Sequence, residues 1–112
     1  MAMETEMKQY DIFWVNLDPI EGSEMAKTRP CVIISPNEMN DYLKTIIIAP
    51  LTTNLKPVRW RVPVFCDGQN GMVALDHVRS VSKSRLCNYV GSLQISEIRV
   101  IKHVLKEMLV DT

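Results

Sequence analysis

The chain consists largely of short runs of β-branched and aromatic residues, each soon ended by proline, glycine or asparagine. Runs of this length and composition are typical of β-strands. We expect strands at residues 10–17, 31–34, 45–49, 61–65, 72–81 and 89–93, and a helical turn at 38–42. Pro50 is expected to stop the third strand, and Pro63 indicates that the fourth lies at a sheet edge.

The last segment has a different hydrophobic period. Its apolar residues recur with the spacing of one helix face: Ile98, Ile101, Leu105, Met108 and Leu109. Ser96 could cap this helix, or Gln94 together with Glu97 three residues on. We therefore expect a flexible lead-in at residues 1–9 and a single domain at 10–112. The domain is expected to be mainly β with a C-terminal α-helix, folded as a small antiparallel barrel that the helix covers.

Charge is unevenly distributed along the chain. The 112 residues carry 13 basic and 13 acidic side chains, so the formal net charge is zero. Residues 1–26 hold six acids and one base, whereas residues 27–85 hold nine bases and four acids. The surplus of five positive charges in the middle segment is enough for several phosphate contacts if the side chains share a face. If they do not, it is scattered surface charge.

Location and redox state can be judged from apolar runs and cysteines. Unbroken apolar runs such as residues 46–49 are far shorter than the roughly 18 residues of a membrane span. Charged residues near the start argue against a signal peptide, so we expect a cytoplasmic protein with no membrane contact. Cys31, Cys66 and Cys87 are odd in number and widely spaced, which favours buried free thiols over a disulfide or a structural zinc site.

Several short motifs follow one another in a distinctive order. They are Trp14-Val15-Asn16-Leu17-Asp18-Pro19, Gly22-Ser23-Glu24, Thr28-Arg29-Pro30 leading into Cys31-Val32-Ile33-Ile34-Ser35, Ile48-Ala49-Pro50-Leu51-Thr52-Thr53-Asn54, Gly71-Met72-Val73-Ala74-Leu75-Asp76-His77-Val78-Arg79-Ser80, and Gly91-Ser92-Leu93. No single motif is specific, but the ordered set resembles the MazF/PemK (Kid) toxin family across residues 10–110.

The resemblance implies a fold, an activity and partners. The fold would be an SH3-like barrel of the CcdB/PemK type that forms a homodimer. The activity would be that of an mRNA interferase, which is the toxin of a type II toxin–antitoxin module and a sequence-specific endoribonuclease acting on single-stranded RNA. The partner would be a MazE-like antitoxin whose extended tail lies in the RNA groove.

RNA cleavage without a metal uses the neighbouring 2′-hydroxyl as nucleophile and leaves a 2′,3′-cyclic phosphate and a 5′-hydroxyl. It requires a base, an acid, and donors that stabilise the charge of the phosphorane. The sequence has two histidines, separated cysteines and no clustered acids outside the loop that follows the first strand. We therefore expect no metal and no other cofactor, which favours this route over a two-metal nuclease.

Three residues are the first catalytic candidates. Arg29 matches the family's catalytic arginine, and its planar, permanently charged guanidinium can grip a phosphate through two N–H groups. Thr52 matches the family's catalytic threonine, which donates a hydroxyl hydrogen bond to the phosphate. Both are expected just outside strand ends, where their polar tips can converge. Glu24 is either a base or a residue that orders its loop.

The chain departs from the family pattern in places. The Kid branch has a histidine where this chain has Ser23 and an arginine near Ala74, so those two catalytic assignments do not transfer. Asp76 matches the family's strand aspartate, and the sequence leaves open whether it is a base or a structural acceptor. His77 stands where glutamine is frequent. Because successive strand residues face opposite ways, we expect His77 to be structural or to contact RNA rather than to act with Asp76.

Basic and aromatic residues supply the candidates for RNA binding: Lys56, Arg59, Trp60, Arg61, Arg79, Lys83 and Arg85. Arg59, Trp60 and Arg61 interleave charge with an aromatic ring, which suits phosphate contact and base stacking. On a strand, however, Trp60 would point away from both arginines.

Two other functions are compatible with such a fold, because function belongs to sites and not to folds. The main alternative is a CcdB-like toxin that binds DNA gyrase without catalysis. The other is a barrel that only binds a peptide or a regulator. The pair Arg29 and Thr52 favours the nuclease.

Overall fold

The computed structural model of the chain describes residues 6–17 and 28–111. Within these ranges lie seven strands: β1 (Asp11–Asn16), β2 (Thr28–Ile33), β3 (Thr45–Thr52), β4 (Arg61–Cys66), β5 (Gln69–Ala74), β6 (Arg79–Ser82) and β7 (Leu86–Ser92). The helices in the same ranges are α1 (Asn37–Tyr42), α2 (Ile95–Leu109) and the 3-10 turns η1 (Leu75–His77) and η2 (Lys83–Arg85).

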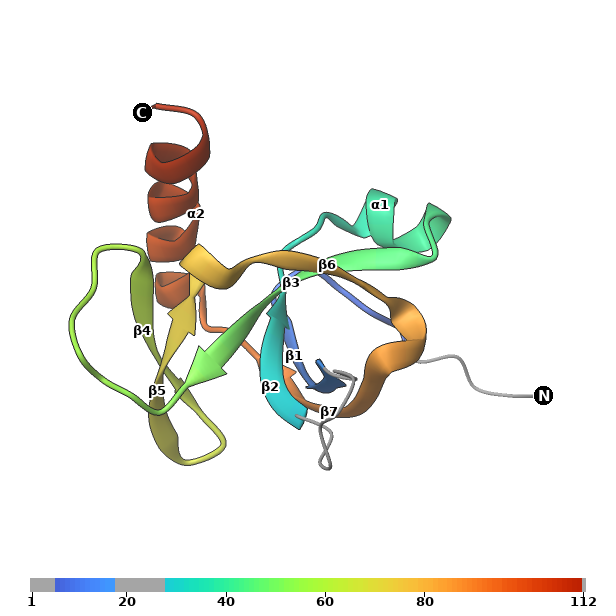
Figure 1. Cartoon of the computed structure of the whole chain (residues 1–112), viewed down its shortest axis with the longest axis horizontal. Coiled ribbons are helices and arrows are strands. Elements are labelled where there is room, and N and C mark those ends of the chain that lie inside the picture. The colour runs from blue at the N-terminus through green and yellow to red at the C-terminus, as the bar shows by residue number, and fades with distance from the viewer. Residues whose placement is uncertain (1–5, 18–27, 112) are drawn as a thin grey trace, which may run out of the picture.

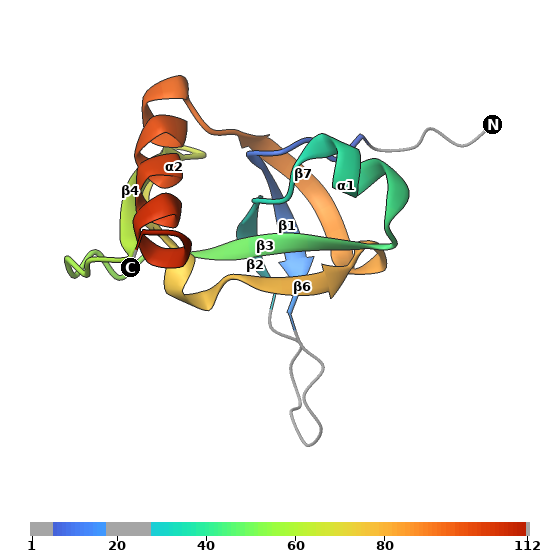
Figure 2. The ribbon, with the colours of Figure 1, turned by 90° about the horizontal axis from the view of Figure 1, so that it is seen from above.

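The strands form one strongly curled sheet. Its order is β4-β5-β3-β2-β1-β7, with β6 paired to β3, and the pairings are antiparallel. The sheet curves into a half-barrel, and α2 stands against β4 at one end of it (Figures 1 and 2). The predicted fold class, an antiparallel β-barrel with a C-terminal helix, is confirmed.

β3 is longer than the sequence suggested. The prediction ended this strand at residue 49, before Pro50, but the strand continues to Thr52. On one edge β3 pairs with β2; on the other, β6 pairs with residues 45–48 and β5 with residues 51 and 52. Pro50 lies where the second edge changes partner, so its missing N–H does not interrupt a ladder on that edge.

The single strand expected at residues 72–81 is in fact two strands, β5 and β6, separated by η1. The N–H of Val78 donates to the carbonyl of Leu75 at 3.2 Å and closes the turn, while the buried Leu75 side chain anchors it in the core. The prediction failed because no glycine or proline marks this turn in the sequence.

The β4–β5 connection is tighter than expected. The strands expected at 61–65 and 72–81 left residues 66–71 between them, but the connection consists of Asp67 and Gly68 alone, since Cys66 already pairs with Gln69. Both turn residues have positive φ, 53° and 75°. An Asp-Gly pair with positive φ is the favoured two-residue connection of a hairpin, because its twist matches that of the strands.

Two apolar clusters form the core. Ile12 and Val32 pack in one cluster with Ile101 of α2, while the adjacent Phe13 and Cys31 belong to the other. Because successive strand residues point to opposite faces, both faces of β1 and β2 are buried. This explains why these strands appear in the sequence as nearly continuous apolar runs instead of alternating ones.

The start of α2 is held by the predicted capping box. The Glu97 carboxylate accepts the N–H of Gln94 at 2.8 Å and also that of Phe65 in β4, again at 2.8 Å. Glu97 therefore caps the helix and ties it to the sheet. The apolar stripe ends earlier than predicted, since Leu109 is 65% exposed. No helix in the described part of the chain is long and apolar enough to cross a membrane.

The cysteines are free thiols, as predicted, but they are not all buried. Cys31 is buried, Cys66 is partly buried and Cys87 is exposed. Burial raises the pKa of the Cys31 thiol to about 12. Cys87 lies on β7, the last strand of the sheet order, and its neighbours Asn88 and Tyr89 are exposed as well.

A small polar network fixes the segment between β2 and β3. The hydroxyl of Ser35 donates to Oδ1 of Asn40 in α1, and Nδ2 of Asn40 donates to the carbonyls of Ser35 at 3.0 Å and Met7 at 3.4 Å. Ser35 and Asn40 are 1% and 2% exposed, so water cannot replace these bonds. The network joins the N-terminal residues, α1 and the sheet.

We predict that Asn40→Ala lowers the free energy of unfolding by about 1–3 kcal/mol, because it leaves buried polar groups without partners. Urea denaturation measures this value. The matched control is Asn88→Ala on exposed β7, which should change stability by less than about 0.5 kcal/mol. Equal effects of the two substitutions would show that the network does not stabilise the fold.

Candidate functional site

Arg29 and Thr52 lie at the same end of two adjacent strands. Cys31 pairs with Pro50 across β2 and β3; Arg29 is two residues before Cys31, and Thr52 is two residues after Pro50. They were expected just beyond the strand ends and instead occupy the second position of β2 and the last position of β3. An even spacing from the paired residues places both side chains on one face.

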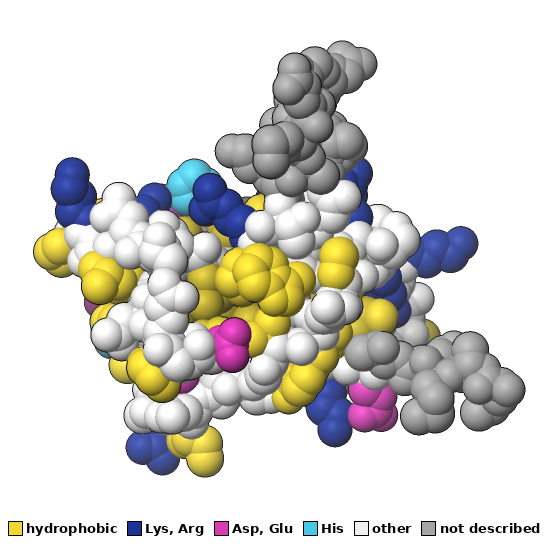
Figure 3. Space-filling view, turned by 90° about the horizontal axis from the view of Figure 1, so that it is seen from below, with side chains coloured by type: hydrophobic (Ala, Val, Ile, Leu, Met, Phe, Trp, Pro, Cys, Tyr) yellow, Lys and Arg dark blue, Asp and Glu magenta, His cyan; other side chains and the backbone are white. Residues whose placement is uncertain are grey.

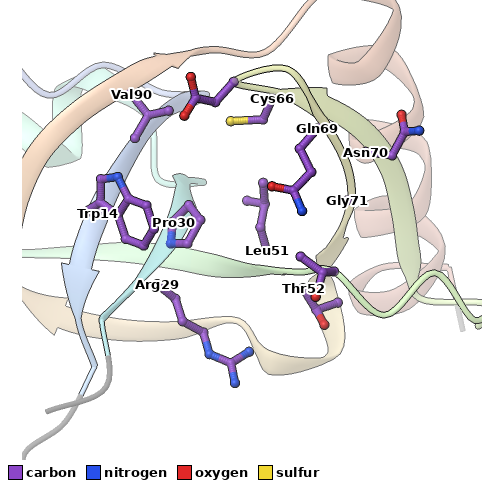
Figure 4. A pocket seen from close by; sticks show the side chains of 12 residues that line it. Trp14, Arg29, Pro30, Leu51, Thr52, Cys66, Gln69, Asn70, Gly71 and Val90 are labelled. Carbon is purple, nitrogen blue, oxygen red and sulfur yellow. The ribbon is translucent and has the colours of Figure 1, made fainter. Parts of the chain in front are cut away.

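A groove of about 320 Å³, here called the main groove, opens between β1–β2 and the β4–β5 hairpin. It is lined by Trp14, Arg29, Pro30, Leu51, Thr52, Thr53, Cys66, Asp67, Gln69, Asn70, Gly71 and Val90. Trp14 and Pro30 form one wall, Gln69 reaches in from the opposite wall, and Arg29 and Thr52 lie along one rim (Figure 4). An apolar groove with a few polar groups is typical of ligand sites.

A second cavity of about 100 Å³, here called the side pocket, lies on the other side of Arg29 and Thr52. Its lining is formed by Arg29, Pro50, Leu51, Thr52, Arg61, Ala74 and His77. Three residues, Arg29, Leu51 and Thr52, are common to both cavities. Arg29 and Thr52, two of the three first catalytic candidates, therefore stand where the two cavities meet.

The hydroxyl of Thr52 is already oriented by its own chain. Its oxygen Oγ1 accepts the N–H of Asn54 at 3.1 Å. A hydroxyl that accepts one bond still has its proton to donate. Thr52 is thus prepared to donate a hydrogen bond to an anionic group beside Arg29.

Asp76, Arg61 and His77 form a chain of contacts at the side pocket. Arg61 donates from Nε to Oδ1 and from Nη2 to Oδ2 of Asp76, both at 3.1 Å. Nε2 of His77 lies 3.4 Å from the same Oδ2. The expectation that Asp76 and His77 face opposite ways was wrong, because they lie in the η1 turn and not on a strand.

Electrostatics distinguish the roles open to Asp76. The hydrogen bonds from Arg61 lower the pKa of Asp76, and the same bonds raise the pKa of Arg61. A carboxylate that is this readily ionised, and that already accepts two N–H bonds, is a weak base. Of the two roles that the sequence left open, the geometry favours the structural one.

Most of the predicted RNA-binding residues lie away from the two cavities. The guanidinium of Arg59 lies 4.5 Å from the ring centre of Trp60, in the turn before β4, so the expected opposite orientation on a strand was wrong. Arg79 and Arg85 donate to the carbonyls of Leu17 and Asn16 and so hold the end of β1. The candidates that line neither cavity are Lys56, Arg59, Trp60, Arg79, Lys83 and Arg85.

Glu24 lies outside the described residues. Among those described, no group of three His, Cys, Asp or Glu side chains is placed to hold a metal ion. On the face seen in Figure 3, apolar side chains gather in the middle, with basic side chains and a histidine along one border. This combination suits a ligand that carries both flat apolar rings and negative charge.

The structure adds residues that were not among the sequence candidates. Trp14 is 39% exposed between buried Phe13 and Val15, and Gln69 projects into the main groove. The outward position of Trp14 could have been inferred from alternation along the first strand. The position of Gln69 could not, because this residue lies between the strands expected at 61–65 and 72–81.

Comparisons with known proteins are consistent in sequence and in structure. The family model of PemK-like, MazF-like toxins of type II toxin–antitoxin systems matches residues 8–109. The endoribonuclease toxin MazF of Escherichia coli (strain K12) is 31% identical over 93 residues, 82% of this chain and 84% of the relative. Endoribonuclease MazF of Staphylococcus saprophyticus is 26% identical over 101 residues, again 82% of this chain and 84% of the relative.

Solved structures share the fold. A MazE–MazF crystal structure from Deinococcus radiodurans (Form-II) superimposes with a TM-score of 0.82 at 23% identity, covering 95% of this chain and 97% of that one. A mycobacterial endoribonuclease in complex with its cognate antitoxin has a TM-score of 0.77 at 20% identity, covering 91% and 93% of the two chains.

The ion pair at the side pocket predicts how stability depends on pH. In the folded protein the pKa of Asp76 is lower than its ordinary value of 3.8. The ion pair therefore stabilises the fold fully above pH 3.8, and this stabilisation is lost as the pH falls through the lower pKa of the folded state. At neutral pH the wild-type protein should therefore be more stable than the Asp76→Asn variant, and the difference should shrink below about pH 4. Urea titrations of both proteins across this range measure it. A difference that does not change with pH would contradict the prediction.

Proposed function

The chain belongs to the PemK-like, MazF-like toxin family of type II toxin–antitoxin systems, and on that premise we propose that it is a sequence-specific endoribonuclease that cleaves single-stranded RNA, mRNA in particular. The observation that carries the proposal is that Arg29 and Thr52 both line the two cavities, at the place where these meet. The matching relatives are MazF endoribonucleases, which supports a nuclease over a CcdB-like gyrase-binding toxin.

The two residues suit the charge that develops during cleavage. When the 2′-hydroxyl oxygen bonds to phosphorus, negative charge accumulates on the phosphoryl oxygens until the 5′-oxygen departs. Arg29 offers a permanent positive charge with two N–H groups that match a phosphate, and Thr52 offers its remaining hydroxyl proton. Donors held in place before the reaction lower the energy of such a transition state.

The main groove suits the part of the RNA that flanks the scissile phosphate. Trp14 presents a half-exposed ring to the groove, which an unpaired base can stack on. Thr53 and Gln69 also line the groove and offer hydrogen-bonding groups. A base in a duplex is already stacked and paired, so this groove favours single strands.

The partners that we propose are single-stranded RNA, a MazE-like antitoxin and a second copy of the chain. Similar structures from D. radiodurans and a mycobacterial species include complexes with an antitoxin. A toxin that acts on mRNA works in the cytoplasm, which is the location that we propose. The toxin domain would extend over residues 10–112.

We predict that Arg29→Ala and Thr52→Ala each reduce RNA cleavage on the order of 100- to 1000-fold, the usual cost of losing one donor to a developing oxyanion. Arg29→Ala should have the larger effect because it also removes a charge. The assay incubates the protein with a long single-stranded RNA in EDTA and maps the cut ends, which should be a 2′,3′-cyclic phosphate and a 5′-hydroxyl.

The matched control is Arg99→Ala on α2, an exposed arginine that lines neither cavity. It should cleave as the wild-type protein does, and the unfolding free energies of the three variants should stay within about 1 kcal/mol of wild type. Cleavage by Arg29→Ala at the wild-type rate would show that the site is wrongly assigned. An uncut RNA with the wild-type protein would refute the nuclease.

We also predict a homodimer, because a chain of this size exposes large apolar side chains that a second copy can cover. Leu55, Phe65 and Tyr89 are each more than half exposed. Light scattering at micromolar concentration should give twice the chain mass, with and without reducing agent, since the cysteines are free thiols. A monomer mass would be incompatible with this assembly.

A further inference from the structure

The catalytic roles proposed for Arg29 and Thr52 leave the neighbouring His77 without a function. Its ring is 62% exposed, lines the side pocket beside both residues, and contacts Asp76. We propose that His77 is the general base that removes the 2′-hydroxyl proton, and that Asp76 and Arg61 are positioning residues that orient its ring. The proposal rests on the nuclease activity proposed above.

The η1 turn brings the ring to the pocket. A strand would have sent Asp76 and His77 to opposite faces, but in the 3-10 turn their side chains meet. The turn is held at its start by the N–H of Leu75, which donates to the carbonyl of Trp60 at 3.1 Å. Arg61, the residue after Trp60, then fixes the Asp76 carboxylate through two hydrogen bonds.

The contact with Asp76 determines which ring nitrogen is available. Nε2 is the nitrogen that faces the carboxylate, and an ionised carboxylate only accepts hydrogen bonds. This 3.4 Å contact favours a neutral ring with its proton on Nε2, an arrangement that leaves the lone pair of Nδ1 to accept a proton. A carboxylate that orients a histidine in this way also stabilises the ring once it becomes charged.

The other side chains of the side pocket cannot serve as the base. Arg29 and Arg61 are permanent cations, Thr52 is a neutral hydroxyl, and the remaining lining residues are apolar. Among the described residues, the charged groups around His77 are Asp76 on its own turn, Arg29 from β2 and Arg61 from β4. Asp76 is itself a weak base for the reason given above. Within the side pocket, His77 is the one described side chain suited to accept a proton.

The step is balanced as follows. Nδ1 of His77 takes the proton of the 2′-hydroxyl, and the 2′-oxygen forms a bond to phosphorus while Arg29 and Thr52 hold the phosphoryl oxygens. The bond from phosphorus to the 5′-oxygen breaks, and the 5′-oxygen leaves with the electron pair and takes a proton from water. The products are a 2′,3′-cyclic phosphate and a 5′-hydroxyl, and the ring afterwards returns its proton to solvent.

The test compares His77→Gln with His103→Gln, which alters the exposed histidine of α2 that contacts Glu107. Single-turnover cleavage should slow by about 100-fold or more in His77→Gln, the usual contribution of a general base, and stay at the wild-type rate in His103→Gln. Binding of an RNA with a 2′-deoxy group at the scissile position should be unchanged in both. Asp76→Asn should slow cleavage less than His77→Gln and leave binding intact.

A second readout separates a base from a structural residue. The wild-type rate should fall at acid pH, because a protonated ring cannot accept the 2′-hydroxyl proton, and this fall should be absent in His77→Gln but present in His103→Gln. Any one of three results would overturn the role of His77. They are cleavage by His77→Gln at the wild-type rate, weakened binding of the 2′-deoxy RNA, and a fall in the rate of His77→Gln at acid pH like that of the wild-type protein. If the wild-type protein leaves RNA uncut, the nuclease fails together with this role.

Discussion

β3 imposes the constraint on which the rest of this fold depends. One of its edges pairs with a single strand, whereas the other is shared between β6 at residues 45–48 and β5 at residues 51 and 52. The chain that supplies both partners must therefore leave one half of the sheet and enter the other within a few residues. The η1 turn makes this crossing beside β3, between its residues 48 and 51. The turn thus brings His77 into the side pocket that Thr52 also lines, although the hydrophobic core alone requires only Leu75 there.

The Arg61–Asp76 pair links this topology to the chemistry of the site. The pair joins β4 to η1 and is only partly exposed, with side chains 20% and 30% accessible. Two arginines line the side pocket, and Asp76 balances the charge of Arg61 but not that of Arg29. Among the described residues no carboxylate forms an ion pair with Arg29, so its guanidinium would attract a phosphate to the boundary of the two cavities. The residue that appeared in the sequence as an RNA contact, Arg61, thereby becomes part of the framework that holds the site.

Local signals predicted the fold well, and long-range contacts limited the prediction of the site. β-branched runs located most strands, and the Gln94–Glu97 capping box located the start of α2, because these features involve residues close in sequence. The η1 turn, which divides residues 72–81 into β5 and β6, was missed because neither glycine nor proline marks it in the sequence. The partner of Arg61 was missed for another reason: Asp76 is 15 residues away, and only the folded sheet brings them together. Arg29 and Thr52 came from the family resemblance, and composition alone would not have singled them out.

On the proposed function, the two cavities divide the recognition of RNA between two kinds of chemistry. The main groove has apolar walls from Trp14, Pro30 and Leu51, so burying a base there gains free energy that does not depend on charge. The side pocket holds two arginines and a histidine, so its affinity for a phosphate depends on charge and is weakened by salt. Base and phosphate of one nucleotide are covalently linked, and only a strand that is free to rotate can place them in both cavities at once. On the proposed function, selectivity for single strands therefore follows from the geometry of the site and does not require recognition of particular bases.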